Sequence, residues 1–203
     1  MSSLVNKTGF VLFAAMAIAI GLYPLMYLLQ DEIFGLLTSK STELLKDDTW
    51  NLAFYTHISL GGVALLSGWS QFSSRLRQKY MGMHRVLGKI YVLSVIFSGI
   101  AALYIAVFAT GGMITSSGFF LLGVFWLVTT IQAYRYVRKG DILKHNTYMI
   151  YSYALCFAAV TLRIWLPLLT MAFGDFLPAY KIVAWLCWVP NLIVAYFINQ
   201  KRS

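Results

Sequence analysis

The chain has 203 residues, of which 60% are hydrophobic and 11% are charged, whereas charged residues make up about a quarter of a soluble chain. This composition excludes a water-soluble domain. The formal net charge of +9 does not indicate nucleic-acid binding, because Lys and Arg gather at the ends of apolar segments and form no basic face with interleaved stacking residues.

Six segments are long and apolar enough to cross a bilayer, which takes about 20 residues of helix. They lie at about 9–29, 51–72, 86–109, 119–136, 147–171 and 181–198. The sequence therefore predicts an all-α integral membrane bundle of six transmembrane helices, forming a single membrane domain over 1–203. The first segment exceeds the core of about 7–15 residues found in a signal peptide, and Pro24 predicts a kink near its end.

The basic residues alternate between the links that join these segments. Links after the second and fourth segments and both ends of the chain are basic, whereas links after the first, third and fifth are acidic or neutral. Because cytoplasmic loops carry an excess of Lys and Arg, this pattern predicts that both termini face the cytoplasm. We expect a multi-pass protein of a bacterial inner membrane.

Each of the three histidines begins a stripe of small or polar residues at helical steps of three and four. The stripes run from His57 through Gln71 to Arg75, from His84 to Ala102, and from His145 through Ser152 to Arg163. Polar groups inside a membrane face protein or water, so we expect the three stripes to face one another in the bundle. Helix packing alone is the simpler interpretation of each stripe.

Depth separates these residues into two groups. His84 and His145 begin their segments at the cytoplasmic side, whereas His57 and Arg163 lie toward the outer side. An arginine within the bilayer costs about 2.5 kcal/mol or more on insertion scales, so Arg163 needs a carbonyl, a water-filled cavity or an anionic ligand as its partner.

One hypothesis is a redox bundle. His84 and His145 would be the axial ligands of a b-type haem, with Arg85 and Lys144 near its propionates. His57 and Arg163 would then shape an outer site for a quinone or another redox partner.

Two further hypotheses stay open. His84, His145 and Asp141 could bind zinc or another transition metal, although they leave a closed site one or two ligands short. Alternatively, a polar path from Arg163 through Ser152 and Gln71 could carry a small solute, or the protein could be a non-catalytic membrane scaffold.

The histidine stripes also carry a family resemblance. The patterns are His57-x-x-x-Gly61-x-x-Ala64-Leu65-x-x-Gly68-x-x-Gln71, His84-Arg85-x-x-Gly88-x-x-Tyr91 and Asp141-x-x-x-His145, the last leading into SYALCFAAVTLR. Over roughly 50–163, the chain resembles the bacterial multi-pass membrane proteins grouped as domain of unknown function 2306. That resemblance implies the fold and the choice of site residues, and it implies no reaction.

The chain is also similar to cytochrome b561-type bundles, which have six spans and four haem histidines. With three histidines in this sequence, a two-haem arrangement with bis-histidine ligation is excluded.

Overall fold

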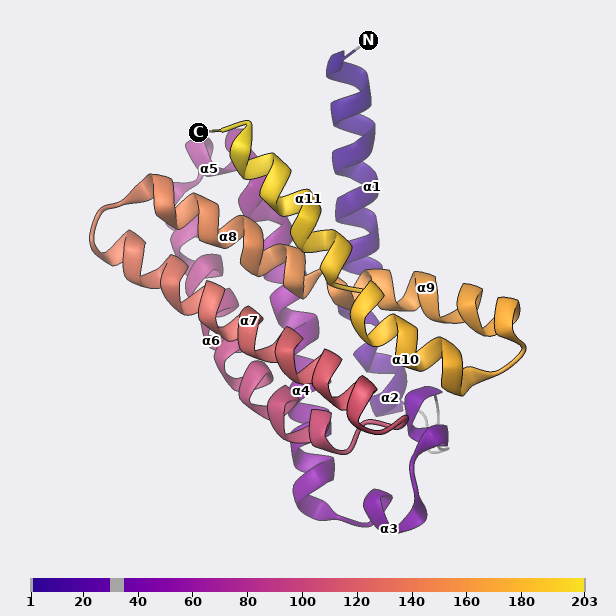
Figure 1. The fold of residues 1–203 in the computed structure, drawn as a ribbon. Helices are drawn as coiled ribbons and strands as arrows, with labels where there is room; N and C mark the ends of the chain where they lie inside the picture. The colour runs from indigo at the N-terminus through magenta and orange to yellow at the C-terminus, as the bar shows by residue number, and fades with distance from the viewer. Residues whose placement is uncertain (1, 30–34, 203) are drawn as a thin grey trace.

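The computed structural model describes residues 2–29 and 35–202, and within them every regular element is a helix. The helices are α1 (Ser2–Leu22), α2 (Pro24–Leu29), η1 (Gly35–Ser39), α3 (Thr42–Leu45), α4 (Asp48–Gly68), η2 (Trp69–Phe72), α5 (Ser74–Lys79), α6 (Met81–Val107), α7 (Met113–Arg138), α8 (Ile142–Cys156), α9 (Ala158–Phe173), α10 (Phe176–Leu186) and α11 (Val189–Gln200). Figure 1 shows that the long helices form one bundle.

Five helical stretches of the described chain are long and apolar enough to cross a membrane. They are Lys7–Tyr27, Met81–Val107, Met113–Arg138, Ile142–Phe173 and Phe176–Gln200. The prediction of an all-α membrane bundle is confirmed. The remaining predicted segment corresponds to α4, which has 21 residues and is less apolar, with Thr56, His57 and Ser59 in its middle. The exact number of six crossings stays a prediction.

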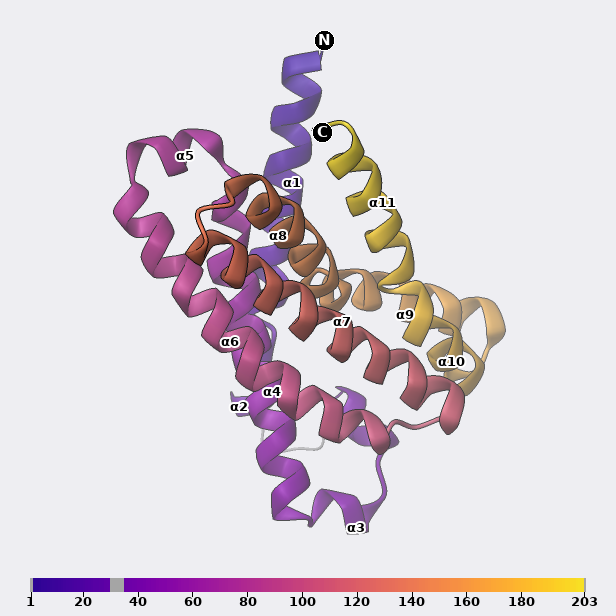
Figure 2. The same ribbon diagram turned by 60° about the vertical axis from the view of Figure 1, so that its left-hand side comes forward.

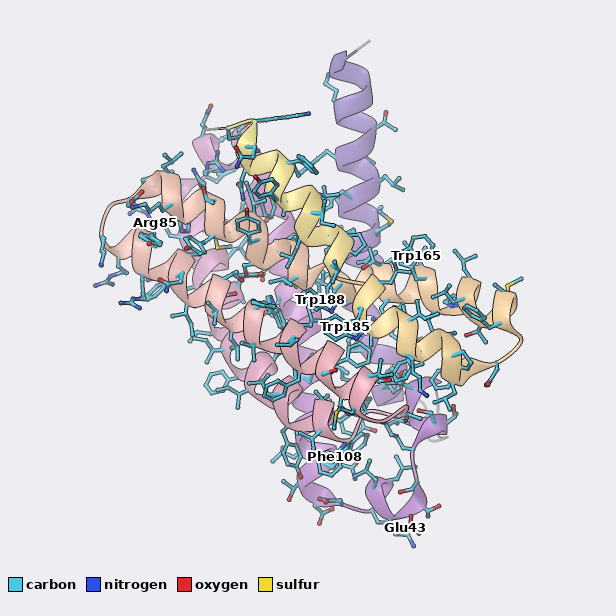
Figure 3. The ribbon with its side chains drawn as sticks, in the orientation of Figure 1. Glu43, Arg85, Phe108, Trp165, Trp185 and Trp188 are labelled. Atoms are coloured by element: carbon cyan, nitrogen blue, oxygen red, sulfur yellow. The ribbon has the colours of Figure 1, made fainter. Side chains whose placement is uncertain are left out.

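The two ends of the bundle differ in charge. The chain termini, α5 and the α7–α8 turn lie at one end, whereas α3 and the α6–α7 turn lie at the other (Figures 1 and 2). Arg85 marks the first end and Glu43 the second (Figure 3). At the second end, the start of α4 carries Asp47 and Asp48. We call these the basic end and the acidic end.

Helix α4 lies inside the bundle, against α1, α6 and α8. Small residues permit these approaches, as is usual where membrane helices pack closely. A Cβ on Gly62 would lie 2.5 Å from the carbonyl oxygen of Gly21 in α1, and a Cβ on Gly68 would overlap the ring of Tyr153. Both positions therefore require glycine in this packing.

Two of the expected spans are each divided into two helices. The breaks fall at Phe157, between α8 and α9, and at Cys187–Trp188, between α10 and α11. Beyond the second break, Pro190 lies in the first turn of α11 and has no N–H to donate. The Cys187 carbonyl oxygen accepts from Thr161 Oγ1 and, over 3.0 Å, from Asn191 Nδ2. The protein itself thus satisfies this carbonyl, as a membrane interior demands.

The first predicted span is also interrupted, at the position that Pro24 indicated. Helix α1 ends at Leu22 and α2 begins at Pro24. Helices α9 and α10 pack against each other and together extend sideways from the bundle (Figures 1 and 2).

Candidate functional site

A buried hydrogen-bond network joins α6, α7 and α8 across the interior. The Oγ atom of Ser152 lies 2.7 Å from the Tyr91 hydroxyl and 2.6 Å from Thr130 Oγ1. Thr130 Oγ1 also donates to the Trp126 carbonyl oxygen over 2.7 Å, and Tyr153 OH donates to the Leu65 carbonyl oxygen over 3.0 Å. We call Tyr91, Trp126, Thr130, Ser152 and Tyr153 the central network.

His84 and His145 are related to this network in the same way. His84 precedes Tyr91 by seven residues on α6, and His145 precedes Ser152 by seven on α8. Seven residues make about two helical turns, or about 10 Å, so each histidine is on the same side of its helix as its network residue. Both helices begin at the basic end (Figure 1). His84 also lies within electrostatic range of His145.

The His145 ring is oriented by a backbone contact. Its Nδ1 lies 2.9 Å from the carbonyl oxygen of Ala133 on α7. A carbonyl oxygen can only accept, so Nδ1 carries a proton, and in the neutral ring Nε2 has the lone pair that a ligand would use. Histidines that bind metals commonly donate their other N–H to a backbone carbonyl in this way.

The His84 ring faces a small cavity at the basic end. Its Nδ1 and the Oε1 of Gln71 are both buried and have no partner in the described chain. The cavity has about 10 Å³ of free volume, close to that of one water molecule. It is lined by Ser70, Gln71, Arg77, Tyr80, Met83, His84 and Leu87.

Open space adjoins α6 between His84 and Tyr91. Gly88 lies one turn beyond His84 on the same stripe, and a Cβ placed there would meet no atom within 4 Å. Gly68, by contrast, has no room for a Cβ. The space at Gly88 is much less confined than the small cavity beside His84.

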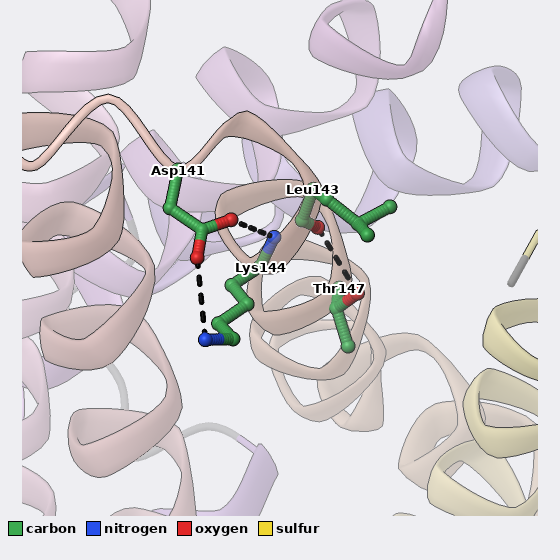
Figure 4. Close-up of polar contacts among 4 residues, drawn as sticks. All are labelled: Asp141, Leu143, Lys144 and Thr147. Atoms are coloured by element: carbon green, nitrogen blue, oxygen red, sulfur yellow. Dashed lines mark hydrogen bonds and ion pairs between the residues drawn. The ribbon is translucent and has the colours of Figure 1, made fainter.

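Asp141 has a structural role at the start of α8. Its Oδ1 accepts from the backbone N–H of Lys144 over 3.0 Å, and its Oδ2 lies 3.3 Å from Lys144 Nζ (Figure 4). The backbone N–H and then the ammonium group lower the pKa of Asp141. Across residues 2–29 and 35–202, no three His, Cys, Asp or Glu side chains gather as metal ligands.

The charges expected near a haem propionate lie at the basic end. Arg85 and Lys144 are both exposed there, with Lys144 engaged by Asp141. Arg77 is partly buried, and its Nη1 donates to the Gln71 carbonyl oxygen over 3.3 Å.

His57 and Arg163 lie within electrostatic range of each other, on the far side of the central network from His84. His57 Nδ1 lies 3.1 Å from Ser98 Oγ, which itself donates to the His57 carbonyl oxygen over 2.9 Å. The Arg163 guanidinium lies over the Tyr23 ring, 4.4 Å from its centroid.

Sequence reasoning did not assign several of these neighbours. The sequence patterns gave no partner role to Tyr23, Ser98, Arg77 or Tyr80. A signal existed for Tyr23, because a buried arginine needs a partner and an aromatic face is one that it commonly finds. No periodicity indicates that the link residues fold back over His84.

Taken together, the apolar helices, the buried glycine contacts and the internally satisfied helix breaks define a multi-pass α-helical membrane protein. The chain belongs to the family described as predicted membrane protein (DUF2306), which matches residues 54–199. That match includes all three histidines and Arg163. No curated protein and no solved structure matches the chain.

Proposed function

We propose that this protein is a membrane redox protein that holds one b-type haem between α6 and α8, with His84 and His145 as axial ligands. The observation that carries the proposal is the placement of the two imidazoles, each seven residues from a residue of the bonded pair Tyr91 and Ser152. A bound haem would supply one-electron chemistry, its iron alternating between the ferric and ferrous states.

The donor set suits a haem better than a bare metal ion. The porphyrin brings four nitrogen ligands, so two imidazoles complete the iron, whereas a zinc site takes three or four ligands from the protein. The Ala133 carbonyl leaves His145 Nε2 free, and the unpartnered His84 Nδ1 marks a ring whose bonding is incomplete. The open space at Gly88 offers room that the cavity beside His84 lacks.

The proposal includes a topology with six crossings and both termini in the cytoplasm of a bacterium. Helix α4 would be the sixth span, since its contacts with α1, α6 and α8 shelter its polar residues from lipid. The haem would then lie on the cytoplasmic side of the inner membrane, with Arg85 and Lys144 near its propionates. A quinone dissolved in the bilayer would suit it as an electron partner.

Colour tests the proposal directly. Protein expressed with ample haem precursor and purified in detergent should show a Soret band and about one iron per chain. His84→Ala and His145→Ala should each lose the band, while His57→Ala should keep it. Colourless, iron-free wild-type protein would refute the haem, as would His84→Ala and His145→Ala variants that keep the wild-type spectrum.

A steric variant tests the location. Gly88→Leu should fill the space between the histidines and Tyr91 and remove the Soret band. Gly82→Leu is the matched control, because Gly82 is on the same helix, also has no atom within 4 Å of an added Cβ, and is two residues from His84, on the opposite side of α6. Equal haem content in the two variants would exclude this location.

A further inference from the structure

Arg163 is a half-buried cation whose charge no carboxylate of the described chain balances. The one ion pair among residues 2–29 and 35–202 joins Lys144 to Asp141 at the basic end. Arg163 instead has the ring of Tyr23 beneath its guanidinium and lies within electrostatic range of Tyr27 and His57. A cation in this setting costs free energy unless something anionic joins it.

The contacts of Arg163 occupy one edge of the guanidinium and leave the other edge without a hydrogen-bond acceptor. Nη1 donates to the carbonyl oxygen of Ala159, one turn back on α9, over 2.8 Å. Nε is buried and has no acceptor in the described chain. Nη2 likewise donates no hydrogen bond to the described residues. The edge formed by Nε and Nη2 presents two parallel N–H groups, which is the fork that binds carboxylate and phosphate oxygens in pairs.

The neighbours hold this fork in place without accepting its hydrogen bonds. Tyr23 covers one face of the guanidinium, and the carbonyl of Ala159 fixes its orientation. His57 offers no negative charge, and its Nδ1 is engaged by Ser98. The side chains of Ile164 and Trp165, next to Arg163 on α9, are exposed on the surface that would face lipid.

We propose that Arg163 is the anchor of a binding site for an oxyanion, a carboxylate or phosphate group that reaches it from the membrane. The group would accept two hydrogen bonds from Nε and Nη2 while the Tyr23 ring covers one face of the guanidinium. Because α9 exposes apolar side chains beside the site, an amphiphile whose head group carries the anion suits it best. The site lies apart from His84 and His145 and does not depend on a haem.

Binding measurements with three probes test this site. Wild-type protein in neutral maltoside micelles is titrated with oleate, with dioleoylphosphatidylglycerol and with inorganic phosphate, at constant ionic strength. Bound probe is measured by native mass spectrometry for the two amphiphiles and by calorimetry for phosphate. We expect at least one amphiphile to bind, with at least tenfold weaker binding in Arg163→Gln.

Three variants make the result specific. Arg163→Lys keeps the charge but loses the fork, so its binding should fall between those of wild type and Arg163→Gln. Lys181→Gln removes one positive charge elsewhere on the chain and should bind like wild type. Tyr23→Leu removes the ring beneath the guanidinium and should weaken binding while Arg163 remains. Size-exclusion profiles and helical circular dichroism establish that each variant is folded.

The three probes identify the source of the oxyanion. Binding of oleate alone indicates a carboxylate amphiphile, binding of the phospholipid indicates a lipid head group, and binding of phosphate indicates a soluble anion. Each result supports the site only if it depends on Arg163. The proposal is overturned if no probe binds, or if folded Arg163→Lys and Arg163→Gln both bind as wild type does.

Discussion

The central network differs from the sites on either side of it in how completely its buried polar atoms are hydrogen-bonded. In the network, the hydroxyls of Tyr91, Thr130 and Ser152 all bond to one another or to a carbonyl. Outside it, five buried side-chain atoms in the described chain have no partner. They are Trp50 Nε1, Gln71 Oε1, His84 Nδ1, Thr115 Oγ1 and Arg163 Nε.

This difference separates the residues that hold the fold from the residues that are available to a ligand. An unpaired polar group costs more in a medium of low dielectric constant than in water, so a folded chain pairs most of them. Three of the five unpaired atoms belong to the two proposed sites. Substitutions in the network should therefore reduce the stability of the fold and leave ligand binding unchanged. Substitutions at His84, Gln71 or Arg163 should affect ligand binding and leave the stability of the fold largely unchanged.

The largest loss of stability is expected for Gly68→Ala. The added Cβ would overlap the ring of Tyr153 and lie 3.1 Å from Tyr91 Cδ2, so α4 would have to move away from the network. Overpacking of this kind costs about 1–3 kcal/mol, and here two rings resist it. The measurement is the free energy of unfolding in mixed micelles with increasing SDS.

Gly88→Ala is the control for this variant, because its Cβ enters open space on α6. It should unfold at the same SDS fraction as wild type. If Gly88→Ala were as destabilising as Gly68→Ala, the contrast between the closed network and the open space would be wrong.

The contrast between glycines shows what sequence patterns can and cannot reveal. Gly68 lies on the stripe that begins at His57 and Gly88 on the stripe that begins at His84, and nothing in the sequence separates the glycine that meets a neighbour from the one that does not. Periodicity predicted the helices and the faces of His84, His145 and Ser152, because helical steps follow from sequence alone. Which glycine meets a neighbour depends on how the helices cross, and the stripe does not encode that.

The helix breaks were harder to predict than the helices themselves. Pro24 and Pro190 mark two of them, but no proline or glycine marks the break at Phe157. That break is accompanied by a bond from Asn191 Nδ2 on α11 to the Ala154 carbonyl oxygen on α8. A partner that lies 37 residues away leaves no local signal.

A smaller loss is expected for Ser152→Ala, which removes the hydroxyl that joins Tyr91 to Thr130. Hydrogen bonds between membrane helices are worth about 0.6–2 kcal/mol, and we expect a loss near 1 kcal/mol in the same SDS experiment. The haem content should not change. Loss of haem without loss of stability would show that Ser152 belongs to the haem site and does not stabilise the fold. Ser117→Ala near the start of α7 is the control, because its hydroxyl bonds only within its own helix.

Gln71→Met should change stability less than Ser152→Ala does and is expected to raise it slightly. The substitution replaces an amide whose Oε1 has no partner by an apolar chain of similar size, and its Nε2 makes contacts no shorter than 3.5 Å. Unfolding in SDS and the width of the Soret band are both measured. A clear loss of stability would show that Gln71 belongs with the paired residues of the network.

The smallest effect is expected for Asp141→Asn, and it should depend on pH. The carboxylate of Asp141 accepts from Lys144, and its pKa is lowered from the ordinary value of 3.8. A lowered pKa in the folded state means that the contribution to stability is complete above pH 3.8 and is lost as the pH falls through the folded pKa. Asparagine also caps a helix well, but it has no charge to lose.

Wild-type protein should therefore be slightly more stable than Asp141→Asn at pH 7, and the two should converge below pH 3.8. Unfolding midpoints in micelles at a series of pH values measure the difference directly, since every other carboxylate is common to both proteins. Metal ligation by Asp141 would give another result, because removing the carboxylate would then lower metal content at pH 7. A constant difference at all pH values would show that the amide disturbs the start of α8 for a reason other than charge.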